Sequence, residues 1–183
     1  GRASVGGGRG MQNIRRVRHS RGDLSHVGVI TTDGHLDKGG AGRVMGADAR
    51  VRFPDNLQLE MQALTSLTGE PDDSLATAGL GDMTFDGGAH TAAFDGETYW
   101  GHALYTSLEY GDRKWDLDVD YWERSPTFRA DNGFEPSNSN REAVFSGGRA
   151  FRFDDSTWLN WINPFVNVGN KWNFEGEKKD EWA

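Results

Sequence analysis

Alternation of apolar and charged residues on both sides of one tight turn constrains the fold of this chain most strongly. Between residues 43 and 53, apolar side chains occupy every second position, at Met45, Ala47, Ala49, Val51 and Phe53. Successive side chains of a strand point to opposite faces, so this segment predicts a strand with one apolar and one charged face. Residues 54–56, Pro-Asp-Asn, are typical of a short turn. Residues 57–63 alternate in the same way, and together the two segments predict an antiparallel hairpin.

The sharpest alternation of the whole chain follows at residues 115–121. Three aspartates, Asp116, Asp118 and Asp120, are separated there by Trp115, Leu117, Val119 and Tyr121. Weaker extended patterns predict further strands at 11–19, 24–32, 96–110, 142–153 and 157–174, the last interrupted by Pro164 at a bulge or an edge. No segment has a helical period, so the sequence predicts an all-β fold with about eight antiparallel strands.

Short and long connections alternate strictly along the predicted strands. The short connections are 20–23, 54–56, 111–114 and 154–156, and the long ones are 33–41, 67–95 and 125–141. In an up-and-down meander all short turns then lie at one end, and the 67–95 and 125–141 loops lie together at the other. This asymmetry is typical of outer-membrane β-barrels. Aromatic residues near the strand ends, at Phe53, Tyr110, Trp115, Phe153 and Trp158 on one side and Trp100, Tyr121 and Trp122 on the other, fit two interfacial girdles.

We therefore predict that residues 1–183 form a single segment of an outer-membrane-type β-barrel, part of a larger barrel, with loop or frayed ends at 1–10 and 175–183. The chain begins at Gly1 with no signal sequence before it, which we interpret as a mature chain or a fragment. A run of about 18 apolar residues is absent, which excludes a helical span but leaves barrel strands of about 10 alternating residues open. The net charge of -8 argues against a nucleic-acid partner.

The charged positions of the predicted strands are the candidate site. We expect Asp48, Arg50, Arg52, Glu60, Asp116, Asp118 and Asp120 to face a hydrated lumen. The three aspartates either bind a cation or line that lumen with Arg or Lys from neighbouring strands offsetting them, and we favour the second interpretation. Asp72, Asp73, Asp82 and Asp86 lack the spacing of a calcium loop, cysteine is absent and the histidines are scattered, so no metal site is predicted. No motif singles out a catalytic residue or a cofactor.

A second candidate site is the segment YWERSPTFRADNGF at residues 121–134. It resembles a recurring segment of the DUF5916 family of bacterial proteins, through Ser125, Pro126, Phe128, Arg129, Ala130, Asp131, Gly133 and Phe134. Residues 28–62 are similar to the barrel repeat of that family, so the resemblance covers residues 24–153. It implies the large outer-membrane-like β-barrel that follows a family 9 carbohydrate-binding-like domain in those proteins, and it implies no activity. Nothing in this chain resembles the carbohydrate-binding domain, and residues 135–140 depart from the family motif.

These observations predict a non-enzymatic segment of a bacterial outer-membrane β-barrel, serving solute passage, surface attachment or assembly. Its expected partners are the lipid bilayer of the outer membrane and the remainder of a larger barrel or other chains of a complex. The alternative is a secreted or periplasmic all-β protein, carbohydrate-active or carbohydrate-binding, in which the aromatic residues line a sugar cleft.

Overall fold

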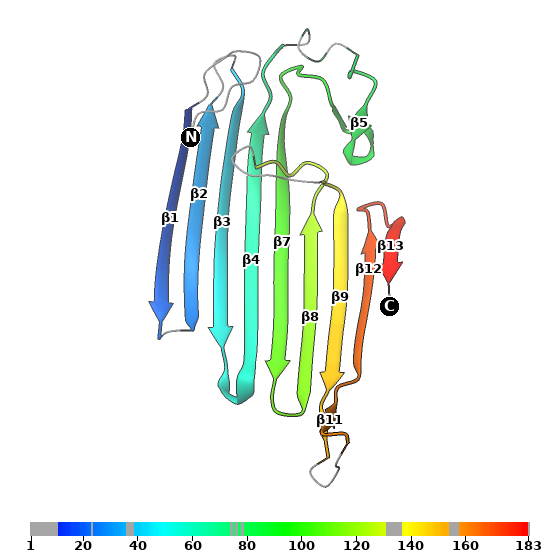
Figure 1. Ribbon diagram of the computed structural model, residues 1–183. Coiled ribbons are helices and arrows are strands. Elements are labelled where there is room, and N and C mark those ends of the chain that lie inside the picture. The colour runs from blue at the N-terminus through cyan, green and yellow to red at the C-terminus, as the bar shows by residue number, and fades with distance from the viewer. Residues whose placement is uncertain are drawn as a thin grey trace.

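One large antiparallel sheet dominates the computed structural model (Figure 1). The structure describes residues 11–22, 24–35, 39–73, 75, 77, 79–130, 137–153 and 158–182. The sheet has nine strands in the order β1-β2-β3-β4-β7-β8-β9-β12-β13. Their bounds are β1 Met11–Arg21, β2 Ser25–His35, β3 Ala41–Arg52, β4 Leu57–Gly69, β7 Thr98–Gly111, β8 Trp115–Arg124, β9 Asn140–Arg149, β12 Phe165–Trp172 and β13 Lys178–Trp182. The all-β prediction is confirmed.

The sheet is a meander, because each of its strands pairs with the next one along the chain. From β1 to β9, the short turns lie at one end of the sheet and the long connections at the other (Figure 1). The last two connections reverse this pattern: the long one from β9 to β12 lies at the end of the short turns, and the short turn from β12 to β13 lies at the end of the long loops. The expectation that the 67–95 and 125–141 loops leave the same end is thereby confirmed. β1 and β13 are the two edges, and no ladder between described residues joins them. A search of the described residues finds no helix long and apolar enough to cross a membrane.

The hairpin of β3 and β4 follows the sequence prediction closely. Its turn is the short 3-10 segment η1, Pro54–Asn56, in which Asp55 and Asn56 adopt φ values of 63° and 61°. Aspartate and asparagine tolerate this left-handed conformation better than most residues, so the turn chemistry suits the geometry. The Phe53 N–H donates to the Leu57 carbonyl at 2.8 Å and closes the turn.

Two terminal expectations need correction. The segment 175–183, expected to fray, contains β13, which pairs with β12. The indole N–H of Trp182 donates to Asn167 Oδ1 at 2.8 Å, and the ring lies over Gly169, where a Cβ would clash with it. The missing side chain of Gly169 thus leaves room for the Trp182 ring, which helps β13 to pack against β12.

The expected strand over 157–174 is also wrong in its first half. β11, Trp161–Ile162, pairs with β10, Phe151–Arg152, and β12 begins only after Pro164. Proline lacks the N–H that a ladder needs, which explains the break. The expected turn at 154–156 lies outside the described residues.

The connection between β4 and β7 is more ordered than its sequence predicted. It carries a small hairpin of β5, Thr84–Phe85, and β6, His90–Thr91, joined by the 3-10 segment η2, Asp86–Gly88. Its two legs stay paired beyond the sheet, through an N–H···O bond of 2.9 Å from Glu70 to Glu97 and a bridge between Asp72 and Asp95. The insertion therefore continues the β4–β7 ladder.

Candidate functional site: the charged face of the sheet

The strand register decides which side chains share a face. Directly paired residues of antiparallel strands project to the same side, and the pairs Arg50 with Glu60, Glu60 with Ser107 and Ser107 with Asp120 connect β3 to β8. By this criterion one face, which we call the charged face, carries all the charged positions predicted from the sequence: Asp48, Arg50, Arg52, Glu60, Asp116, Asp118 and Asp120. The opposite side, the apolar face, carries the alternating apolar residues.

Ion pairs join strands at the N-terminal side of the charged face, and one of them spans from β1 to β3 across β2. Arg16 on β1 and His26 on β2 both reach Asp48 on β3, at 2.9 Å and 3.2 Å. Arg50 donates to Glu60 Oε2 from both Nε, at 2.9 Å, and Nη2, at 2.5 Å. On this part of the face, each of the carboxylates Asp48 and Glu60 therefore has an arginine partner from another strand.

Carboxylates without cationic partners dominate the same face on β7 and β8. Glu109 accepts from Gln58 Nε2 at 3.0 Å and Asp118 from Ser107 Oγ at 3.4 Å, and the Tyr105 hydroxyl contacts Asp120 at 3.5 Å. Among the described residues no Arg or Lys forms an ion pair with Asp116, Asp118 or Asp120. Uncharged donors contact two of these aspartates instead, and the expectation that Arg or Lys from neighbouring strands offset their charge stays a prediction.

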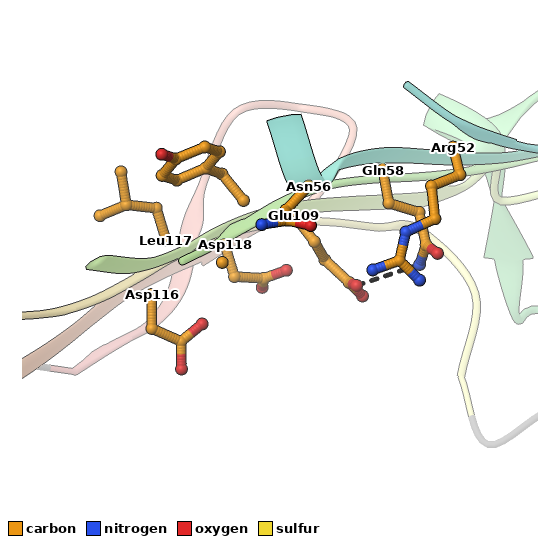
Figure 2. Close-up of a pocket in the computed structure, with 9 residues that line it drawn as sticks. Arg52, Asn56, Gln58, Glu109, Asp116, Leu117 and Asp118 are labelled. Carbon is orange, nitrogen blue, oxygen red and sulfur yellow. Dashed lines mark hydrogen bonds between the residues drawn. The ribbon is translucent and has the colours of Figure 1, made fainter. Parts of the chain in front are cut away.

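Three of these acids, Glu109, Asp116 and Asp118, line an open hollow near the short turns, with a volume of about 270 Å³. Figure 2 shows the residues around it. The carboxylates of Glu109, Asp116 and Asp118 project to one side of the sheet, and Leu117 projects to the other. Arg52 borders the hollow from β3. The hollow thus presents several carboxylates and one guanidinium to solvent, a lining suited to polar or charged solutes.

The segment 125–130, which we call the strap, crosses the charged face near the long loops (Figure 1). Phe128 is buried, and a Cβ on Gly101 of β7 would lie only 2.3 Å from the Phe128 Cα. The Arg129 N–H donates to Ser66 Oγ of β4 at 3.1 Å. The strap backbone therefore rests directly on two central strands.

Further hydrogen bonds fasten the start of the strap. The His102 N–H donates to Ser125 Oγ at 2.9 Å, and the Ser125 N–H donates to the His102 carbonyl at 2.9 Å. The Asn138 amide donates to the Phe128 carbonyl at 2.5 Å. Ser125, Pro126, Phe128 and Arg129 of the family-like motif thus lie in one ordered element, whereas Asp131, Gly133 and Phe134 lie outside the described residues.

Sequence reasoning missed Ser66 and Gly101, the residues that receive the strap. Gly101 did carry a signal, because a glycine inside a strand often marks the close approach of another backbone. Ser66 carried none, since serine is unremarkable on a polar face.

A polar cluster around Glu123 lies on the apolar face, at the end near the long loops. His102 Nε2 lies 3.3 Å from Glu123 Oε1, and Arg141 Nε lies 3.6 Å from Glu123 Oε2. The guanidinium of Arg141 also covers the ring of Phe174 at 4.0 Å. His102 lies between Trp100 and Leu104 on the apolar face of β7, and its partner Glu123 is an acid at the margin of the apolar band.

In comparisons with known proteins, the chain matches no family model, no curated protein and no solved structure. The fold and the site define its class as an all-β chain with a large antiparallel meander, charged on one face and apolar on the other. The resemblance to the DUF5916 family stays a prediction.

Proposed function

We propose that this chain is a segment of a bacterial outer-membrane β-barrel, with the apolar face toward lipid and the charged face lining a hydrated interior used by polar solutes. The family-like residues of the strap are consistent with the barrel region of the DUF5916 proteins. In this proposal additional strands, from the same or another chain, pair with the edges β1 and β13.

One observation carries the proposal. Large apolar side chains of the sheet are exposed on one face, whereas small polar side chains are buried on the other, the reverse of the usual arrangement in water. On central strands of the apolar face, Met45 is 58% exposed and Val119 is 47% exposed. On the charged face, Ser66 and Ser107 are 0% and 2% exposed. A large contiguous apolar surface is rare on soluble monomers and marks contact with membrane or another protein.

The dimensions of the apolar face suit a bilayer. On β4 its residues run from Leu57 to Leu67 with Thr65 as the one polar member. At about 3.4 Å per residue this run is about 34 Å long, and a strand tilt of about 40° reduces its height to about 26 Å. The apolar band of outer-membrane barrels is about 25 Å tall.

The band also crosses the paired rows of residues diagonally, as tilted strands require. The row that begins at Val29 continues through Ala47, Ala63 and Leu104 and then reaches the charged residues Glu123 and Arg141. The apolar residue Val168 on β12 lies instead in the row of Leu108, four residues further along β7 than Leu104. A horizontal membrane slab would cut a sheet of tilted strands along such a diagonal.

The charged face supports passage of polar solutes more than attachment or assembly. Its carboxylates at Glu109, Asp116 and Asp118 stand around an open hollow at one end, and the strap crosses the face at the other. In a closed barrel the strap would narrow the interior. Charged side chains that line a pore tune which solutes enter it.

Spin labels test directly whether the apolar face contacts lipid and the charged face contacts water. The chain has no native cysteine, so a single introduced cysteine carries the only label. Val119→Cys and Asp118→Cys place one label each on neighbouring residues of β8 that face opposite sides. The purified protein in lipid vesicles is measured by power saturation with oxygen, which concentrates in the bilayer, and with a water-soluble nickel complex. We expect the Val119 label to collide mainly with oxygen and the Asp118 label mainly with nickel.

A nickel response at Val119 as strong as at Asp118 would overturn the proposal. So would protein that stays monomeric in solution without detergent and does not enter vesicles.

The carbohydrate-binding alternative has one observation in its favour. Tyr105 and Trp122 stack on the charged face with ring centroids 5.5 Å apart, close to Asp120. Aromatic rings beside carboxylates are suitable for holding a sugar. A soluble, detergent-free monomer whose tryptophan fluorescence is quenched by oligosaccharides would favour that function.

A further inference from the structure

Carboxylates converge at the neck of the insertion between β4 and β7. One oxygen from each of Glu70, Asp95 and Glu97 lies within 4.8 Å of the other two. The neck is well built, because the backbone pairs Glu70 with Glu97, and the Asp73 N–H donates to the Phe94 carbonyl at 2.9 Å. These acids differ from the aspartates of the insertion that the sequence suggested for calcium, Asp72, Asp73, Asp82 and Asp86.

Glu70 supplies a buried oxygen that has no partner. Its side chain is only 1% exposed. Oε1 accepts from the Tyr99 hydroxyl at 2.7 Å and lies 3.4 Å from Arg129 Nη2, whereas Oε2 is buried without a hydrogen bond. An unsatisfied buried carboxylate oxygen is costly, so a donor or a cation is expected there.

The other two carboxylates are held in place through one oxygen each. Glu97 Oε2 lies 3.1 Å from His90 Nδ1 and accepts the Thr91 N–H at 3.3 Å. Asp95 Oδ2 accepts the Thr91 hydroxyl at 3.0 Å. These hydrogen bonds orient the carboxylates and leave each with a second oxygen for a ligand.

The charge at the neck is unbalanced. Three carboxylates face one guanidinium, that of Arg129, and one imidazole, that of His90. Carboxylates this close repel one another unless a cation lies between them. A divalent cation would remove the imbalance.

We propose that Glu70, Asp95 and Glu97 form a calcium site that clamps the two legs of the insertion together. Oxygens that share a calcium ion at about 2.3–2.6 Å lie up to about 5 Å apart, whereas the shorter bonds of magnesium, about 2.0–2.1 Å, bring them within about 4 Å. The limit of 4.8 Å within which the three oxygens lie falls inside the range that calcium spans. Water completes the coordination on the side where Asp95 is exposed.

The site does not depend on the proposed function, because it concerns the insertion alone. It predicts that the insertion needs a divalent cation for full stability. With the ion bound, the two legs of the insertion stay paired between Glu70 and Glu97. We expect an affinity of about 10⁻⁴ to 10⁻³ M, the range of calcium sites in extracellular modules.

Terbium luminescence tests the site on the purified full chain in a nonionic detergent and a phosphate-free buffer. Terbium replaces calcium, and Tyr99, hydrogen-bonded to Glu70, should transfer excitation energy to it. We expect a saturable signal that calcium displaces and magnesium displaces far less. Asp95→Asn and Glu97→Gln should weaken binding by about tenfold or more, since even partners outside the ligand shell are worth about 10- to 100-fold.

Asp82→Asn is the matched control, because it removes the same charge from an exposed position of the same insertion. It should leave terbium affinity within about twofold. Limited proteolysis gives a second readout, in which calcium should slow cleavage of the insertion in the wild type and in Asp82→Asn but not in Asp95→Asn. A signal that does not saturate, or equal weakening by Asp82→Asn and Asp95→Asn, would overturn the proposal.

Discussion

The two faces of the sheet satisfy their side chains in different ways. On the charged face, polar groups from different strands pair with one another, as Arg16 does with Asp48 and Arg50 with Glu60, and the strap covers Ser66. On the apolar face, Met45, Met61 and Val119 project into open space. Burial of apolar surface is the main stabilising term of folding in water. A sheet whose apolar face is exposed needs an apolar medium or a partner to cover that face.

The largest expected effect comes from placing a charge on the apolar face. Val119→Arg should lower the free energy of unfolding in lipid vesicles by about 2 to 4 kcal/mol, because hydrocarbon does not solvate the guanidinium. Asp118→Arg, one residue away on the charged face, should cost much less. Equilibrium unfolding in denaturant of both variants gives the comparison, and equal losses would remove the distinction between the faces.

A second substitution at Val119, studied without detergent, distinguishes an apolar face covered by lipid from one covered by protein. Val119→Phe should aggregate or stay insoluble if lipid covers this face, because the added ring enlarges an exposed apolar surface. Size-exclusion chromatography without detergent is the measurement. A stable monomer would mean that the chain covers its own apolar face, and the barrel proposal would then be abandoned.

A smaller effect is expected where the strap meets β7. Gly101→Ala puts a Cβ at 2.3 Å from the Phe128 Cα, so strap and strand must separate, at a cost of about 1 to 3 kcal/mol. Gly111→Ala, at the end of the same strand, has nothing within 4 Å and should change stability by less than about 0.5 kcal/mol. Thermal unfolding of both variants tests the close approach, which a neutral Gly101→Ala would contradict.

A weaker effect again is expected from the ion pair of Arg50 with Glu60. A double-mutant cycle with Arg50→Gln and Glu60→Gln should give a coupling of about 0.2 to 1 kcal/mol, because both side chains are partly exposed. The pair of Arg43 with Asp33 on the other face is more exposed and should couple less. Raising the salt concentration should reduce both couplings. A larger coupling for Arg43 with Asp33 would contradict the argument that the less exposed pair couples more strongly.

The smallest effect concerns Asp112, in the turn between β7 and β8. The backbone N–H groups of Trp115 and Lys114 donate to this carboxylate and lower its pKa. The stabilisation is therefore complete above the unfolded pKa of about 3.9 and is lost as the pH falls through the lower folded pKa. Melting temperatures of wild type and Asp112→Asn should differ by a constant amount above about pH 5 and converge in stronger acid. A melting-temperature difference that persists at the lowest pH would show that the ionised Asp112 carboxylate is not its cause.

Much of the sheet was predictable because its determinants are local. A strand alternates its side chains by backbone geometry, so the runs around Val51 and Leu117 reveal both the strands and their faces. The turn at 54–56 was predictable from residues that tolerate its conformation. The end of the sheet at which each long loop lies then follows from counting strands.

The strap, the last strand and the carboxylate cluster were not predictable, because each depends on residues that only the fold brings together. Gly101 receives Phe128, Gly169 receives Trp182, and Glu70 meets Glu97 across the neck of an insertion without a clear sequence period. Such contacts depend on which strands are neighbours and on the space that a missing side chain leaves, and a local pattern records neither. The sequence alone determined the strands from β1 to β9 of the large sheet and the character of their two faces, because both follow from the two-residue repeat of the extended backbone. The tertiary structure alone decided which polar groups are buried, because burial depends on what the rest of the chain places above them.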